Sequence, residues 1–176
     1  AECGVNSHIH IMTIMIGRGD IYSDDHVTLS GDGARFDADA AYLGKNSQTI
    51  DYNIVADHFG KKTESLITVN GALTDSAKKV FRGTIDFKKG SADSVGSENE
   101  TVLMLGDDVV NKTVPLILCA EENVEGTHGA TIGELDADTM FYFESRGIDR
   151  ETAEKIMAYA AVERLIHMAE DSEFAA

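Results

Sequence analysis

The feature of this sequence that most constrains its fold is a period-2 alternation of apolar and polar residues over the first 135 positions. In "ARFDADAAYLG" the even positions are apolar, and charges stand at Arg35, Asp37 and Asp39. Such alternation indicates strands with one buried face. Roughly eight or nine strands follow one another, separated by Gly-, Asp- and Asn-rich turns, without an intervening helix. The pattern predicts a sandwich, a barrel or a β-solenoid, and the uneven spacing does not establish a repeat.

Composition narrows the possible functions. The 176 residues fit one domain. A formal net charge of −16 argues against nucleic acid, which is bound by basic surfaces, and against anionic membrane surfaces. No apolar run approaches the ~20 residues of a transmembrane helix. The two cysteines, Cys3 and Cys119, are too few for a disulfide framework. We therefore expect a protein of the reducing cytoplasm.

The pattern changes near Leu135, so we expect a β region over 1–135 and a helical region over 136–176. Asp136 or Asp138 is placed to cap a first helix, which Gly147 ends. Asp149 is placed to cap a second helix over about 150–169. That helix carries one apolar stripe and, on its far side, a patch of Tyr159, Val162 and Ile166. Two apolar faces predict a helix that is covered twice, either by its own domain or by a partner protein.

The histidines are the first candidates for chemistry. His8 and His10 lie two residues apart, so strand alternation points both to the same side, as in cupin-type metal barrels. His58 or His128 would then supply a further ligand. The alternative is a pair of surface or partner-facing histidines. Neither a nucleophile elbow, a P-loop nor a dinucleotide-binding motif occurs. Cys119 follows the apolar run "LIL", where a thiol is typically buried and inert.

His128 shares parity with Val124, Ala130 and Ile132, which favours a packed core imidazole. The flanking Gly126 and Gly129 instead leave its backbone open to close approach. An imidazole also binds iron. Both interpretations, core side chain and ligand, remain open at this point.

One stretch resembles a known family. "THGATIGELDADTMFYFESRGI" (127–148) is similar to the C-terminal signature of the SufB/SufD family of iron–sulfur cluster assembly proteins. In the SufD branch this signature reads Ser-His-Gly-Ala-Thr-x-Gly-x-Leu-Asp, followed by Phe-Tyr-x-x-Ser-Arg-Gly-Ile. The similarity extends upstream through "DHFGKKTES", "GALTDSAKKVFRGTIDF" and "ETVLMLGDDVVNKTVPLILCAEENVEGTHGA", about two-thirds of the chain.

The resemblance implies a right-handed parallel β-helix followed by a small helical region. It further implies a non-enzymatic scaffold that pairs with a SufB-type subunit or with itself and docks a SufC-type ABC ATPase. His128 is then the residue expected to bind a transient iron–sulfur cluster shared with the partner subunit. Tyr159, Val162, Ile166 and Arg146 are expected to contact the ATPase. No stably bound cofactor is expected in the isolated chain.

Departures from the family pattern favour the SufD branch. SufB carries a cysteine at the position of Glu100, and it flanks the signature histidine with glutamates where this chain has Thr127 and Gly129. We also expect this chain to be shorter than full-length members and to lack their N-terminal region. The cupin-like metalloenzyme that uses His8, His10 and a third histidine remains the alternative.

Overall fold

The computed structural model describes residues 1–168 and contains ten strands and two helices. The helices are α1 (Ala137–Ser145) and α2 (Arg150–Met168). The strands are β1 (Glu2–Cys3), β2 (His8–Ile16), β3 (Ile21–Leu29), β4 (Arg35–Gly44), β5 (Thr49–His58), β6 (Glu64–Thr74), β7 (Lys78–Phe87), β8 (Ser94–Leu105), β9 (Val110–Cys119) and β10 (Val124–Gly133).

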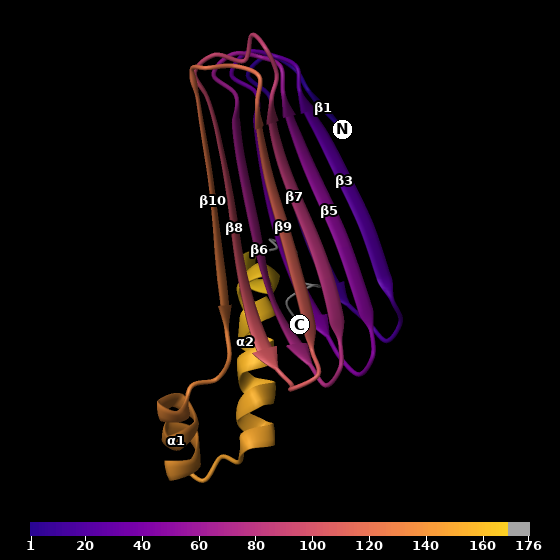
Figure 1. Cartoon of the computed structure of the whole chain (residues 1–176), viewed down its shortest axis with the longest axis vertical. Coiled ribbons are helices and arrows are strands. Elements are labelled where there is room, and N and C mark those ends of the chain that lie inside the picture. Colours follow the sequence, from indigo (N-terminus) through magenta and orange to yellow (C-terminus); the bar gives the residue numbers. More distant parts are fainter. Residues whose placement is uncertain (169–176) are drawn as a thin grey trace.

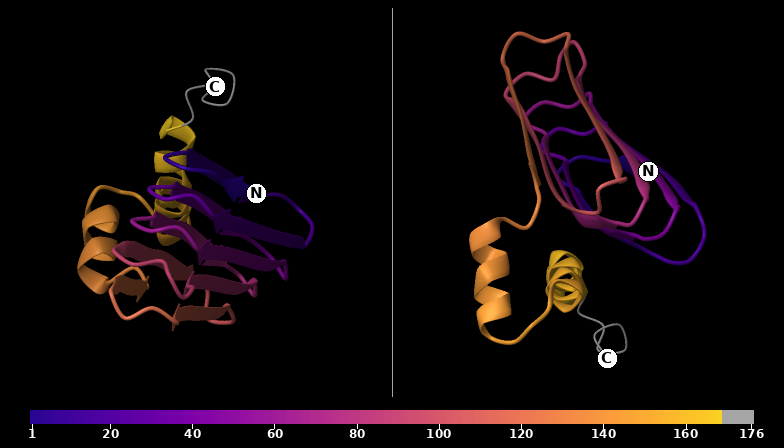
Figure 2. Two further views of the ribbon diagram at one scale, coloured as in Figure 1. Left: turned by 90° about the horizontal axis from the view of Figure 1, so that it is seen from above. Right: turned by 60° about the horizontal axis from the view of Figure 1, so that its bottom comes forward.

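The strands wind into a parallel β-helix. One sheet has the order β1-β3-β5-β7-β9 and the other β10-β8-β6-β4-β2, so each coil contributes one strand to each sheet. All the pairings are parallel. Figures 1 and 2 show the coils stacked from the N-terminal end to β9 and β10 at the other end. Of the three architectures that the alternation allowed, the solenoid is the one formed, as the family resemblance implied.

The coils stack in register because alternate residues of each strand face the interior, and the inward residues of one strand pair with those of the next. Along β5, Ile50, Tyr52, Ile54 and Ala56 are buried, whereas the residues that alternate with them are only partly covered. His8 pairs with Arg35, Arg35 with Glu64 and Glu64 with Val95, so the step between coils varies around roughly 30 residues. This variation is why the sequence alone shows no regular repeat.

The corners of the coils repeat as well. Gly33, Lys62 and Asp93 all adopt a positive φ at the same corner. The backbone N–H of Gly33 donates to Lys61 O of the next coil at 2.8 Å, and that of Lys62 donates to Ala92 O at 2.9 Å. The turns therefore satisfy their polar backbone by stacking on one another.

The helices begin where the sequence predicts. Asp136 caps α1 by accepting a hydrogen bond from Thr139 N at 2.6 Å, and Gly147, with φ +78°, follows its end. Asp149 accepts from Thr152 N at 2.8 Å at the start of α2. No helix within residues 1–168 combines the length and apolar character needed to cross a membrane.

The helix α2 lies across the outer face of the second sheet and contacts β2, β4, β6 and β8 (Figure 1). Ala158, Val162 and Leu165 pack there on small and branched side chains, namely Ala41, Leu43 and Ala72. Val162 is only 1% exposed and Ile166 is partly buried in the same cluster, whereas Tyr159 is 58% exposed. The predicted patch is therefore divided: Val162 is a core residue, Ile166 packs beside it, and Tyr159 faces outward.

Candidate functional site

His128 stands on β10, the last strand of the second sheet. It pairs with Glu98 of β8, which in turn pairs with Ile67 of β6. Ile67 and Glu98 are both buried, so this column of residues faces the interior. No coil follows β10 within the described part of the chain, and His128 is therefore exposed at the open end of the solenoid. The predicted parity is right, but the core interpretation is wrong, because no residue among 1–168 covers this level of the stack.

The glycines around His128 serve different purposes. A Cβ on Gly126 would lie 2.8 Å from Ile117 Cγ2 and 3.1 Å from Phe87 Cε2. Gly126 therefore lets β10 close against the side chains of its own core. A Cβ on Gly129 would lie 3.3 Å from Asn99 Oδ1, which a flexible side chain can accommodate. The close approach expected at Gly126 is thus made by the chain itself.

Beneath the last coil lies a buried charged cluster. Lys79 on β7 and Glu100 on β8, each with a side chain 1% exposed, form an ion pair across the interior. Thr113 on β9 donates to Glu100 Oε2 and accepts from Lys79 Nζ at 3.2 Å. Burial lowers the pKa of Lys79, and the Glu100 charge opposes that shift. Glu100 thus belongs to an internal ion pair.

Glu98 completes this cluster and has no partner for its Oε2 atom within the described residues. Its carboxyl group fits beside Gly83, where a Cβ would lie only 2.2 Å from that oxygen. Burial raises the pKa of Glu98 to about 7, and the neighbouring Glu100 adds to the shift. Sequence reasoning missed Lys79, Glu98 and Glu100. Lys79 lies on the same face of its strand as the buried Phe81, and Glu98 and Glu100 lie on the same face of theirs as the buried Val102. This alternation is the signal that would have found them.

The other histidines do not converge. His8 and His10 face outward on β2, where each Nε2 lies 2.9 Å from a carboxylate oxygen, of Asp37 and Asp39 respectively. Within residues 1–168, no group of three His, Cys, Asp or Glu side chains is arranged to hold a metal ion. The parallel solenoid also differs from the barrel on which the cupin-like alternative depends.

His58 is instead a satisfied core residue. Its Nδ1 lies 2.7 Å from Thr63 Oγ1 and its Nε2 lies 2.9 Å from Ser65 Oγ. Its ring also packs against Phe87. Burial lowers the pKa of His58 to about 4, so the imidazole is neutral in the native protein near neutral pH.

The cysteines lie on strands at opposite ends of the stack, and both thiols are free. Cys3 is buried on β1, whereas Cys119 is exposed at the end of β9. The expectation that Cys119 is a buried packing group is wrong. Its strand, like that of His128, belongs to the last coil, and no further coil among the described residues covers it.

The terminal strands offer an apolar surface beside this open end. On the outer face of β9, Val114, Leu116 and Leu118 are each about two-fifths to one-half exposed. Strands β9 and β10 are the edge strands of their sheets at this end. Unpaired edges combined with apolar side chains are typical of surfaces that pair with another chain.

A second apolar surface lies on the helices. Phe141 and Tyr142 of α1 are 72% and 56% exposed, and Tyr159 of α2 is similarly open. The Arg146 guanidinium lies 5.0 Å from the centre of the Tyr142 ring. Of the residues predicted to bind a partner, Tyr159 and Arg146 are thus accessible. Phe141 and Tyr142 were not predicted, although two consecutive aromatic residues on a short helix are a recognisable signal.

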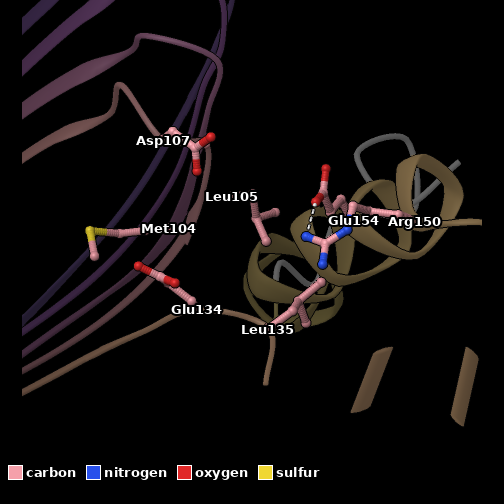
Figure 3. A pocket seen from close by; sticks show the side chains of 8 residues that line it. Met104, Leu105, Asp107, Glu134, Leu135, Arg150 and Glu154 are labelled. Atoms are coloured by element: carbon pink, nitrogen blue, oxygen red, sulfur yellow. Dashed lines mark hydrogen bonds and ion pairs between the residues drawn. The ribbon is translucent and has the colours of Figure 1, made fainter. Parts of the chain in front are cut away.

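A cleft of about 250 Å³ separates the β-helix from the start of α2 (Figure 3). Asp107 and Glu134 approach it from the β-helix side, and Arg150 pairs with Glu154 at 3.3 Å on the helix side. Its remaining lining residues are Met104, Leu105, Gly106 and Leu135. The cleft holds neither His128 nor a candidate nucleophile, and its polar walls differ from the apolar walls of typical small-molecule sites.

Comparison with known proteins identifies the family. The SufBD core domain of the SUF iron–sulfur cluster assembly system matches residues 1–161. The iron–sulfur cluster assembly protein SufD of Bacillus subtilis is 31% identical over 159 residues, which cover 90% of this chain and 36% of that protein. SufD of Escherichia coli is 28% identical over 99 residues, covering 56% of this chain and 23% of that protein.

A chloroplastic SufBD family protein of Arabidopsis thaliana is 25% identical over 150 residues, which cover 85% of this chain and 27% of that protein. The chain thus spans about a quarter to a third of the length of these curated relatives. The matched region includes all the strands, α1 and most of α2. The chain belongs to the SufBD family of iron–sulfur cluster assembly proteins.

Proposed function

We propose that this chain is a non-enzymatic, SufD-like scaffold on which a second subunit completes a transient iron–sulfur site. The observation that carries the proposal is the position of His128, which belongs to the stretch that resembles the family signature and lies exposed on the last strand, at the open end of a stiff β-helix. A stack of parallel coils is suited to holding such a side chain in a fixed place at an interface.

The cluster would be cargo rather than a resident cofactor. Iron–sulfur clusters generally take four protein ligands, mostly thiolates. His128 is one imidazole, and Glu100 of this chain is engaged in the internal ion pair. The remaining ligands would therefore come from the partner, and the isolated chain would hold no cluster stably. The two free cysteines are consistent with action in the reducing cytoplasm.

The partner subunit would join at the open end of the β-helix. The edges of β9 and β10 lie at this end, and the outer face of β9 carries the apolar side chains Val114, Leu116 and Leu118. A SufB-type subunit or a second copy of this chain that extended both sheets would cover these groups. Such pairing would place the partner's ligands opposite His128.

The helices would dock a SufC-type ABC ATPase. Tyr159, Phe141 and Tyr142 present exposed aromatic rings, which are enriched at protein interfaces, and Arg146 stacks on one of them. Because α2 packs firmly across four strands, a force applied to the helices would be transmitted to the β-helix. ATP-driven movement of the ATPase would thereby act on the cluster site.

Co-purification tests these two contacts separately. The tagged chain is co-expressed with the SufC-type ATPase and the SufB-type subunit of the same organism. We expect Tyr159→Asp to abolish capture of the ATPase but not of the SufB-type subunit, and Leu116→Asp to do the opposite. Lys61→Asp, at an exposed turn, serves as the control. Retention of both partners by both variants would contradict the proposed surfaces.

A further inference from the structure

The proposed scaffold function assigns no role to the charged cluster inside the β-helix, and the position of this cluster in the stack is informative. In the coils nearer the N-terminus the same columns are apolar: Ile50 precedes Lys79, and Ala40 and Val69 precede Glu100. The interior can therefore be filled without charges at these columns. At these columns, charges occur only in the coil directly beneath β9 and β10.

The strand β9 has little apolar burial to hold it in place. Its inward residues Thr113 and Ile117 are only partly buried, because no coil lies over them in the described chain. Its outward residues Val114 and Leu116 are exposed. Apart from the backbone ladder to β7 and the packing of Ile117 on the core, its side chains are attached to the interior by the hydrogen bonds from Thr113 to Glu100 and from Lys79 to Thr113.

We propose that Lys79, Glu100 and Thr113 form a buried clasp that holds β9 closed over the interior, so that β9 opens locally when the clasp is broken. A buried ion pair adds little net stability compared with apolar packing but specifies one arrangement of its elements. Here it specifies the closed position of the terminal strand. This inference is independent of the scaffold function, because it concerns how the last coil is attached and not what binds there.

The surroundings of the clasp favour a second, open state. Three of the four buried side-chain atoms that lack a hydrogen-bond partner within residues 1–168 surround it: Tyr42 Oη, Glu98 Oε2 and Asn111 Oδ1. Lys79 lies 5.7 Å from the centre of the Tyr42 ring, and Asn111 pairs in register with Lys79. Release of β9 would expose these atoms and both charges to water, which lowers the cost of opening relative to an apolar core.

Hydrogen exchange measured by mass spectrometry tests the clasp. Thr113→Val removes the hydroxyl while keeping the shape of the side chain. We expect amide exchange over residues 110–119 to be at least about tenfold faster than in the unchanged protein, the effect of losing hydrogen bonds to charged groups. Exchange over 49–58, in the interior strand β5, is expected to stay unchanged.

Two further variants make the result specific. Thr113→Ser, which keeps the hydroxyl, is expected to retain slow exchange over 110–119. Thr68→Val, at a half-buried threonine on the outer face of β6, is expected to leave 110–119 unaffected. Unchanged exchange in Thr113→Val would overturn the clasp. So would an equal acceleration in both segments or loss of the whole fold, because the clasp is proposed to hold β9 alone.

Discussion

His128 lies directly beside Glu98 in the ladder of parallel strands, on the same inward face, yet one side chain is exposed and the other is 2% exposed. A single step along the stack separates the open end of the β-helix from its interior. This step gives His128 a fixed backbone position without burying its imidazole, and both properties are needed by the proposed ligand of a site that a second subunit completes.

The first prediction follows from this contrast. Replacing His128 by Ala should change the free energy of unfolding by less than about 0.5 kcal/mol, as for most exposed side chains. Ile67→Ala, in the same column but fully buried, should cost about 2–4 kcal/mol. Urea unfolding followed by circular dichroism measures both. A large loss in His128→Ala would mean that the imidazole is structural.

The second prediction concerns Glu98, whose pKa is raised by burial from 4.5 to about 7. The native state holds the carboxyl proton of Glu98 more tightly than the unfolded state does. The contribution of this proton to the free energy of unfolding is therefore complete below pH 4.5 and is lost as the pH rises towards 7. The loss amounts to roughly 2–3 kcal/mol. Glu98→Gln mimics the protonated carboxyl group, and the stability of this variant relative to the unchanged protein should therefore rise over that range. A constant difference would contradict the raised pKa.

The third prediction concerns His58, whose pKa is lowered by burial to about 4. The native state favours the neutral imidazole. Its contribution to the free energy of unfolding is therefore complete above pH 6.5 and is lost as the pH falls towards 4. The pH dependence due to His58 is opposite in sign to that due to Glu98, and the two pH ranges overlap. A measurement of total stability against pH therefore does not separate the two residues. The imidazole resonances of His58 in NMR spectra should stay constant down to about pH 5. A midpoint near pH 6.5 would show that the ring is solvated.

The fourth prediction separates the two sides of α2. Val162→Asp places a charge in the cluster with Ala158 and Leu165 and should release the helix from the sheet, at a cost of about 3 kcal/mol or more. Tyr159→Asp, on the outer side of the helix, should change the free energy of unfolding by no more than about 0.5 kcal/mol relative to the unchanged protein. Limited proteolysis between α1 and α2 reports the release. Equal resistance of the two variants would contradict the observed docking.

The strands were predictable because their alternation is a local property. The segment 34–44 shows it clearly, and β4 forms there. Which strands pair was not predictable from alternation, because partners such as Arg35 and Glu64 lie far apart and the step changes from coil to coil. Only the family resemblance distinguished a solenoid from a sandwich or a barrel.

The site was predictable in part, for physical reasons that differ between residues. Parity gave the correct side for His128, but its exposure depends on where the stack ends. Lys79 and Glu100 have inward parity, yet charged residues ordinarily face water, and only a partner across the interior explains them. A helical wheel identifies the stripes of α2 but not the one that meets the small side chains of Ala41 and Ala72.

The central claim is that His128 contributes to a cluster site completed by a second subunit. Its most direct test is anaerobic cluster assembly on the complex of this chain with a SufB-type subunit and the ATPase, followed by visible absorption and iron content. We predict that His128→Ala forms the complex at normal stoichiometry but gains no cluster, whereas Thr127→Ala, the outward-facing neighbour, assembles it normally. Full cluster assembly on the His128→Ala complex would contradict the account.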